Sequence, residues 1–408
     1  MRSFYWSVNM NIKSTSSSRT FPKRLYCQPA CTLEFPFNTE VSDAWSVSGS
    51  GIGRGSHSLK TALGEYYERK HFYTDITPEA LGTLNYSLSV DEAAHFAHAF
   101  AQTSFPSRPH NALLNHTFHL TKVIRTSDFT DCHIPTACLS LNHYDLGEDN
   151  SIYPLKDTCG CSFHWDANKT IFSALKECLE RQFLTRFWLT GQHTERMESP
   201  LIISALRASD TLPLATTLSK TGELVAFDIS DPLFPGTCII VFYGQKKSAH
   251  HVKYCTGMAY SMTQKHGLEK AVAELWQTFR FMDLFIGCNG NTNALKDPYL
   301  RHFFDCNTYL TFTAATTSQK RTIHIKKNER PFNTNCLLEA LNKQKIQGYF
   351  YLKASHIDSK KCLFCKFISP QLFMHMDNSK HINLHNHYSS IFKEKILPAR
   401  QKIMVPFP

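Results

Sequence analysis

The stretch Asp157–Gly191, DTCGCSFHWDANKTIFSALKECLERQFLTRFWLTG, decides the fold. Its first residues include turn formers and two cysteines, and the remainder has the pattern of a helix. On that helix Glu177, Glu180 and Arg181 have the spacing E-x-x-E-R, and residues three and four apart lie on one helical face. Two carboxylates and a guanidinium that project together are suited to divalent cations and a polyphosphate.

A second E-x-x-E-R, formed by Glu65, Glu68 and Arg69, follows the Gly-rich run SGSGIGRGS at residues 48–56. Glycines let backbone N–H groups approach phosphate oxygens, and a helix N-terminus favours anions. GIGRG lacks the Lys-Ser/Thr of a P-loop, which excludes a Walker-type site. One such triplet is usually a solvated ion pair worth less than about 0.5 kcal/mol. Two copies behind Gly, Ser and Cys turns indicate a shared site.

The composition indicates a folded protein with a large core. The chain has 408 residues, of which 42% are hydrophobic and 30 are phenylalanine. That length allows one large domain or two to three small ones. The net charge of +10 includes no long run of Lys and Arg, which argues against a nucleic-acid-binding arm. The basic excess fits either phosphate on a small molecule or an ordinary solvated surface.

Cysteine spacing and hydropathy indicate the compartment. The 14 cysteines are spaced irregularly, and no apolar core follows the basic residues of the first 30 positions, as a signal peptide would require. The longest strongly apolar run, Cys238–Tyr243, is too short to cross a bilayer. We therefore expect free thiols, a cytoplasmic location and no membrane span.

Hydrophobic periodicity predicts four helices besides that of the first stretch, over residues 59–73, 91–102, 200–208 and 267–285. Apolar and β-branched runs predict strands over residues 117–125, 134–142, 224–229, 237–243, 349–353 and 365–369. Pro135 would stand at the start of the second strand, where its missing N–H is tolerated. Together these elements predict an α/β fold of the mixed α+β kind.

The segments between these elements are expected to be irregular. Residues 1–40 would hold no more than a short strand, and the Gly/Ser-rich residues 46–58 would form a loop. The expected division is an irregular N-terminal segment at 1–45 and one domain at 46–408, with a polar basic loop near 315–333 and a C-terminal tail at 397–408.

A zinc site is a weaker alternative. Cys362 and Cys365 form the one C-x-x-C, whereas structural zinc normally needs four ligands. Two ordinary thiols beside a polar surface fit the loose spacing better than a site completed by late histidines. The histidines that could complete such a site are His375, His381, His385 and His387.

The last five residues, MVPFP, allow two interpretations. Chain ends commonly fray, and this one would then have no role. Alternatively, the prolines make the end a stiff extended arm that places the terminal carboxylate inside a site.

Several stretches, in their order along the chain, resemble the YcaO family of ATP-dependent enzymes that activate backbone amides. These stretches are GRGSHSLKTALGEYYERKHF at 53–72, DTCGCSFH at 157–164, LKECLERQ at 175–182, AVAELWQ at 271–277 and the final MVPFP. More narrowly, the chain looks like the cyclodehydratase subunit of microcin B-type synthetases. The resemblance covers nearly the whole chain, from about Ser46 to Pro408.

The resemblance implies that ATP is bound without a P-loop and that Mg²⁺ ions bridge acidic helices and phosphates. The implied metal ligands are Glu65, Glu68, Glu177, Glu180 and Glu274. The implied contacts to ATP and its phosphates are Arg54, Thr61, Arg69, Arg181, Gln277 and Arg301. The carboxylate of Pro408 would act in catalysis as a base or orienting group.

The chain departs from the family pattern at three places. Many members have an acidic residue eight positions before Glu177, where this chain has Lys169. Met404 occupies the first position of a longer Pro-x-Pro-x-Pro tail. Phe279 stands where an arginine often follows E-x-x-Q, and Arg280 could substitute for it.

By resemblance, the reaction converts Cys and Ser (or Thr) residues of a ribosomal precursor peptide to thiazolines and oxazolines. The implied partners are that peptide, an E1-like leader-binding zinc protein and an FMN-dependent dehydrogenase, in a hetero-oligomeric synthetase without nucleic acid or membrane. Two alternatives stay open: a YcaO enzyme that makes thioamides or amidines, and a catalytically quiet subunit that binds the peptide. Lys169 is the residue that favours the second.

Overall fold

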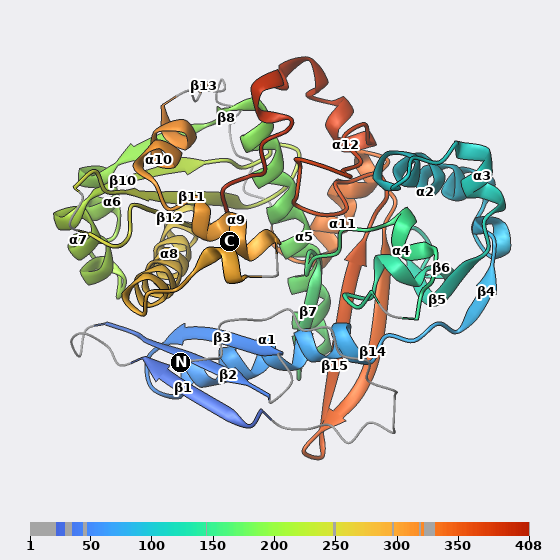
Figure 1. Cartoon of the computed structure of the whole chain (residues 1–408), viewed down its shortest axis with the longest axis horizontal. Coiled ribbons are helices and arrows are strands. Elements are labelled where there is room, and N and C mark those ends of the chain that lie inside the picture. The colour runs from blue at the N-terminus through green and yellow to red at the C-terminus, as the bar shows by residue number, and fades with distance from the viewer. Residues whose placement is uncertain are drawn as a thin grey trace.

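The computed structural model describes residues 22–28, 35–43, 47–143, 145–247, 250–295, 298–317, 320–321 and 331–407 (Figure 1). The strands are β1 (Arg24–Gln28), β2 (Phe37–Ser42), β3 (Ser48–Gly53), β4 (Ala80–Gly82), β5 (Phe118–Arg125), β6 (Asp131–Pro135), β7 (Cys161–His164), β8 (Gln192–His193), β9 (Glu195–Glu198), β10 (Glu223–Asp228), β11 (Thr237–Gly244), β12 (Tyr254–Ser261), β13 (Lys320–Arg321), β14 (Tyr349–Ile357) and β15 (Lys360–Ile368). The helices are α1 (Ser56–Thr74), α2 (Val90–Thr103), α3 (His110–Asn115), α4 (Asp149–Ile152), α5 (Ala167–Thr190), α6 (Ser199–Ala205), α7 (Leu212–Thr221), α8 (Gln264–Gly287), α9 (Pro298–Asp305), α10 (Tyr309–Thr316), α11 (Thr334–Lys343) and α12 (His387–Ser390). The mixed α/β fold class is confirmed.

Three antiparallel sheets organise the chain. Their strand orders are β1-β2-β3, β12-β11-β10-β9 and β4-β5-β14-β15-β7, with β6 paired to β5 in the last. Helix α5 stands between the second and third sheets (Figure 1) and shares one buried cluster with both. Because it is enclosed on two sides, the second half of α5, from Gln182 to Thr190, is buried around most of its circumference. The helix that carries the second E-x-x-E-R is therefore the centre of the fold.

The side chains of β11 alternate between two helices. Ile240 and Phe242 belong to the cluster around α5, whereas Ile239 and Val241 pack in the cluster around α8. This alternation is the expected period of two along a strand. Both faces of the second sheet are thus buried, and α5 and α8 are held on opposite sides of it.

The Gly-rich run forms strand β3, so the prediction of a loop over residues 46–58 is wrong. A Cβ atom on Gly49 would lie 2.2 Å from the carbonyl oxygen of Ala62, and one on Gly51 would lie 2.3 Å from that of Ser58. The alternating glycines let the backbone of α1 pack directly on the strand. Close approach between helix and strand, rather than turn formation, explains the glycines.

Two further expectations need correction. The strand expected over 134–142 is β6, which ends at Pro135, and a 3₁₀ turn at Thr136–Cys138 follows it. Proline suits the end of the strand because its fixed φ, here −55°, leads into the turn. The last two strands are longer than expected and form a hairpin through Asp358 and Ser359, both with positive φ.

The helices expected from periodicity are confirmed as α1, α2, α6 and α8, and the one in the first stretch as α5. Strands β1 and β2 lie in the segment at 1–45 and pair with each other, and β2 pairs with β3 across the expected domain boundary, which stays a prediction. Most of the expected loop at 315–333 lies outside the described residues. No helix in the described ranges combines the length and apolar character needed to cross a bilayer.

Candidate active site

The first triplet is tied to the free edge of β3. Glu65 Oε2 accepts hydrogen bonds from the backbone N–H of Ser50 at 2.5 Å and from its hydroxyl at 3.1 Å. Arg69 pairs with the other oxygen of Glu65 at 2.5 Å and donates to the carbonyl of Ser48 at 3.3 Å. Among the described strands β3 pairs with β2 alone, so its outer N–H and C=O groups are available to α1 side chains.

Helix α8 brings the third set of residues to the same place. Gln277 Nε2 donates to the hydroxyl of Ser50 over 2.9 Å, so Gln277 and Glu65 share one serine. One turn earlier, Glu274 accepts from the backbone N–H of Met258 at 3.1 Å. The family-implied residues of α1 and α8 therefore meet at β3.

The second triplet is tied to another free edge. Glu180 accepts from the backbone N–H of Tyr260 at 2.5 Å and from Lys176 at 3.1 Å. Strand β12 ends its sheet, and Met258 and Tyr260 are two residues apart on it, so their N–H groups point to the same side. Glu180 from α5 and Glu274 from α8 thus approach one strand edge.

The carboxylates of the two triplets interact. Burial, followed by the charges of Glu177 and Glu65, raises the pKa of Glu68 well above its ordinary value. Burial raises the pKa of Glu177 to about 8, with Arg181 opposing the shift and Glu180 adding to it. Burial and Glu180 raise the pKa of Glu274 to about 7. Burial and mutual repulsion favour the neutral forms of these carboxylates, and a bound divalent cation would favour their ionised forms.

Arg181 has an unused donor within the site. Its Nε lies 3.8 Å from Glu177, and its guanidinium lies 5.2 Å from the ring centre of Phe407. The buried Nη1 has no hydrogen-bond partner among the described residues. A buried charged donor without a partner is costly, and a phosphate oxygen is a suitable acceptor for it.

Magnesium fits this arrangement only together with other ligands. Within the described ranges, no group of three or more His, Cys, Asp or Glu side chains is placed to hold a metal ion by itself. Mg²⁺ at nucleotide sites typically takes one or two carboxylates plus phosphate oxygens and waters. The buried, mutually repelling carboxylates of Glu68, Glu177 and Glu274 are compatible with such shared coordination.

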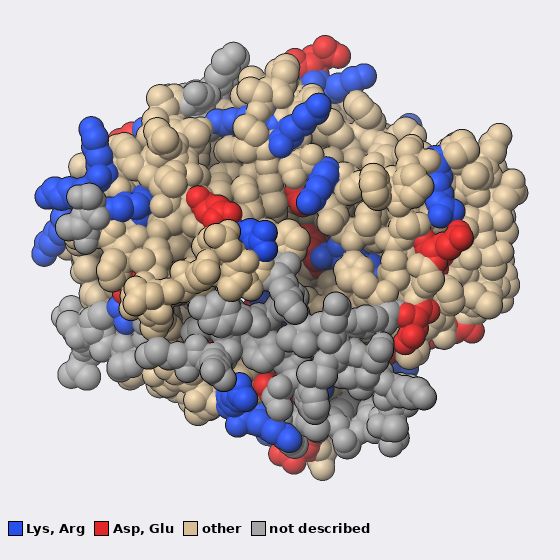
Figure 2. Space-filling model, in the orientation of Figure 1, with Lys and Arg blue, Asp and Glu red and all other residues tan. Residues whose placement is uncertain are grey.

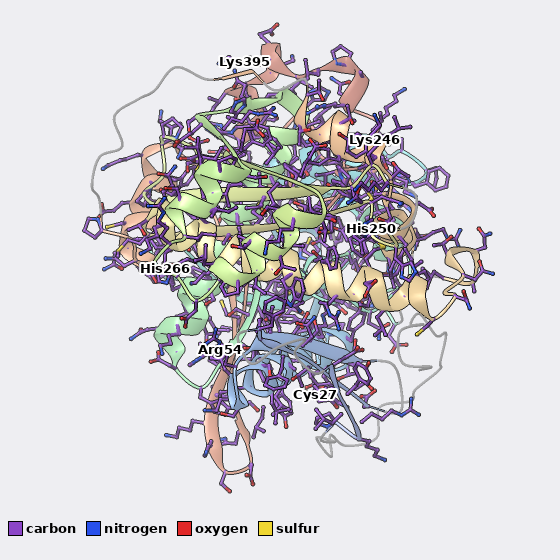
Figure 3. All side chains as sticks on the ribbon, turned by 90° about the vertical axis from the view of Figure 1, so that its left-hand side faces the viewer. Cys27, Arg54, Lys246, His250, His266 and Lys395 are labelled. Carbon is purple, nitrogen blue, oxygen red and sulfur yellow. The ribbon has the colours of Figure 1, made fainter. Side chains whose placement is uncertain are left out.

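The remaining implied contacts are less enclosed. Arg54 lies exposed at the turn between β3 and α1, beside the N-terminal sheet (Figure 3). Thr61 is one turn before Glu65, and its hydroxyl donates to the carbonyl of His57. Arg301 is exposed and donates to the carbonyl of Leu295. Their contacts to ATP stay predictions, and Pro408 lies outside the described residues.

Lys169 does not enter the site. It is exposed in the first turn of α5, where its backbone N–H bonds to the cap residue Asp166 at 3.1 Å. Eight helical residues span about 12 Å, which places Lys169 far from Glu177 along the helix. Asp157, at the start of this stretch, adds to the raised pKa of Glu177 after burial and Glu180.

Whether Arg280 replaces the family arginine stays a prediction. Its Nη1 lies 3.8 Å from a carboxylate oxygen of Asp283, and its guanidinium lies over the ring of Trp276. Phe279 is stacked on the same tryptophan, with 5.6 Å between the ring centres. The guanidinium is therefore engaged on its own helix.

Three polar residues of the site were missed from the sequence. The Ser50 hydroxyl binds Glu65 of α1 and Gln277 of α8. In the sequence, only the alternation of Ser50 with glycines could have indicated that its side chain lies on the strand face opposite to theirs. Lys366, 5% exposed, donates to the carbonyl of Asp157 at 3.1 Å and opposes the raised pKa of Glu68. Glu40 is opposite Ser50 in the sheet, and burial and Glu65 raise its pKa to about 7. No motif marks Lys366 or Glu40.

The structure contradicts the zinc alternative. Cys362 and Cys365 are three apart on β15 and belong to different buried clusters. His375 Nε2 is hydrogen-bonded to the carbonyl of His381, and His387 Nε2 is hydrogen-bonded to the carbonyl of Gln344. A cavity of about 410 Å³ is lined by His385, His387 and two histidines of α2, but no metal-ligand group forms among the described residues.

The face in Figure 2 shows basic and acidic side chains scattered among a larger uncharged surface. No continuous basic stripe crosses that face.

Comparisons with known proteins agree with the geometry. A family model described as YcaO cyclodehydratase, ATP- and Mg²⁺-binding, matches residues 50–371. The microcin B17-processing protein McbD of Escherichia coli is 29% identical over 406 residues, 98% of this chain and 100% of that protein. A chain of the E. coli microcin synthetase McbBCD complex with pro-MccB17 bound has a TM-score of 0.87 and 28% identity, covering 98% of this chain and 100% of that one. YcaO from Methanopyrus kandleri, bound with AMPPCP and Mg²⁺, shares the fold, with a TM-score of 0.55 and 9% identity over 92% of this chain and 89% of that one.

Proposed function

The chain belongs to the YcaO family of ATP- and Mg²⁺-binding cyclodehydratases, and from that premise we propose that it is the cyclodehydratase subunit of a microcin B-type synthetase. It would convert Cys and Ser (or Thr) residues of a precursor peptide to thiazolines and oxazolines. The observation that carries the proposal is the meeting of the two E-x-x-E-R helices, where Glu68 and Glu177 interact beside a buried, unpartnered Arg181 nitrogen.

The residues of the site suit this chemistry. ATP, when bound, supplies the phosphoryl group that turns the amide oxygen of the peptide into a leaving group. Phosphoryl transfer requires positioning and charge neutralisation, which Glu68 and Glu177 would provide through Mg²⁺ and Arg181 through its free donor. Ring closure and elimination also require proton transfer, for which the carboxylate of Pro408 is the proposed group.

The relatives support the proposed partners. The E. coli structure is a complex named McbBCD that contains pro-MccB17. We propose that this chain likewise assembles with a precursor peptide and two different subunits. These subunits would be an E1-like leader-binding zinc protein and an FMN-dependent dehydrogenase. Free buried thiols, among them Cys138, Cys238 and Cys255, support a reducing cytoplasm as its location.

The test is reconstitution of the synthetase from this chain and the products of its neighbouring genes. Phosphate release and peptide mass are followed together. The proposal predicts ATP consumption that depends on precursor peptide, with loss of one water per ring. Gain of sulfur in the peptide would indicate a thioamide-forming enzyme instead. Absence of peptide-dependent ATP consumption would indicate a peptide-binding subunit.

A further inference from the structure

We infer that Asn378 is a positioning residue, which sets the register of the carboxyl-terminal tail and thereby determines which tail residue lies under Arg181. The inference rests on the proposed function, because it assigns Asn378 a role in ring formation. Residues 401–407 form no helix or strand. Their position therefore depends on side chains that bind the tail backbone.

Both ends of the Asn378 amide bind the tail. Its Nδ2 donates to the carbonyls of Arg400 at 3.0 Å and Ile403 at 2.8 Å. Its Oδ1 accepts from the N–H of Val405 at 2.9 Å. The side chain is 2% exposed. One buried amide thus fixes three backbone groups over six residues, with a longer contact of 3.5 Å to the carbonyl of Gln401. A shift of the tail by one residue would leave the amide unsatisfied.

Helix α5 provides a second anchor. Trp188 Nε1 donates to the carbonyl of Ile403 at 2.8 Å, and the guanidinium of Arg400 lies 4.5 Å from the ring centre of Trp188. Arg400 also donates to the carbonyl of Trp188 at 3.1 Å. The tail is therefore attached to the same helix that carries Glu177 and Arg181.

The end of the tail reaches the second triplet. Tyr254, a buried residue of β12, donates to the carbonyl of Pro406 at 2.5 Å. The next ring, Phe407, is 1% exposed and lies under Arg181 at 5.2 Å. The register set by Asn378 consequently determines which tail residue contacts Arg181.

Asn378→Asp is the sharpest variant, since it keeps the size of the side chain and removes the donor to two carbonyls. Asn383→Asp is its matched control. Asn383 is also buried, donates to the carbonyl of Leu372 at 2.6 Å and accepts from the N–H of Met374 at 3.1 Å, but it binds no tail residue. Tyr254→Phe is a milder second variant, which removes only the hydrogen bond to Pro406.

The variants are compared in the reconstituted synthetase with precursor peptide. We expect Asn378→Asp to lower kcat for ring formation by about tenfold to a hundredfold, as misplacement of a reacting group does, with the Kd for ATP changed less than about twofold. Hydrogen exchange at residues 403–407 should accelerate. Tyr254→Phe should show the same pattern more weakly, and Asn383→Asp should show neither effect.

Adding one glycine after Pro408 provides an independent readout. Because both changes misplace the same residue, the glycine should cost wild type much of its kcat and cost Asn378→Asp little more. Normal kcat in Asn378→Asp and Tyr254→Phe, or full additivity with the added glycine, would overturn the inference. Absence of ring formation by the wild-type complex would instead overturn the proposed function.

Discussion

The guanidinium of Arg181 lies 5.2 Å from the ring centre of Phe407, although 226 residues separate them in sequence. This contact joins the central helix to the end of the chain. The tail, the two E-x-x-E-R helices and α8 therefore form one site, from four distant parts of the sequence.

Charge at the site should be required for catalysis and not for folding. We expect Glu65→Gln to reduce ATP-dependent ring formation by about a hundredfold or more, because the carboxylate is a proposed metal ligand. Circular dichroism and thermal unfolding check that the variant stays folded. Glu339→Gln, on the exposed face of α11, is the control and should keep full activity. Equal activity in both variants would remove Glu65 from the site.

The raised pKa of Glu177 predicts a pH dependence of stability. The folded protein keeps this proton to about pH 8, whereas the unfolded chain releases it near pH 4.5. The folded state binds more protons in that window, so the free energy of unfolding should fall as the pH rises through it. Glu177→Gln should flatten this slope in thermal unfolding without nucleotide. An unchanged slope would contradict the assigned environment.

The affinity for Mg²⁺ and nucleotide should rise with pH, whereas the free energy of unfolding falls. A cation favours the ionised carboxylates, so binding releases protons from Glu177 and Glu274, whose pKa values are raised to about 8 and about 7. Titration calorimetry with a non-hydrolysable ATP analogue and Mg²⁺, in buffers of different ionisation heat, measures this release. Affinity should rise from pH 6 to pH 8; proton uptake on binding would contradict the prediction.

Arg181→Lys should weaken nucleotide binding. Lysine keeps the charge but cannot present the planar donors of arginine. Loss of one charge-assisted hydrogen bond, about 1.5–3 kcal/mol, corresponds to an increase in Kd of about tenfold to a hundredfold. Arg196→Lys, at a partly exposed ion pair with Glu198, serves as the control in the same titration. Unchanged affinity in Arg181→Lys would show that its free nitrogen does not bind phosphate.

The close packing of α1 on β3 predicts opposite effects of two glycine substitutions. Gly51→Ala places a Cβ 2.3 Å from the carbonyl oxygen of Ser58 and should cost about 1–3 kcal/mol of stability, along with activity, since α1 carries Glu65. A Cβ added at Gly64 would meet no atom within 4 Å, so Gly64→Ala should stabilise α1 by about 0.5–1 kcal/mol. Chemical denaturation measures both. Similar stability changes in the two variants would contradict the packing argument.

The sequence predicted α2 and α8 well because each has an apolar face packed against its neighbours. The sequence also identified the paired glutamates, because their spacing places them on one face of a helix. It failed at β3, where glycines that serve helix–strand packing have the same composition as a loop. Ser50, Lys366 and Glu40 were missed because their roles depend on strand pairing and burial, which no local spacing encodes.

The ratio of phosphate released to water lost from the peptide, measured in the reconstituted synthetase, tests the central claim most directly. We expect one phosphate per ring, no phosphate release without precursor peptide, and loss of both products in Glu65→Gln. Ring formation without ATP consumption, or equal ATP consumption with and without the peptide, would contradict it.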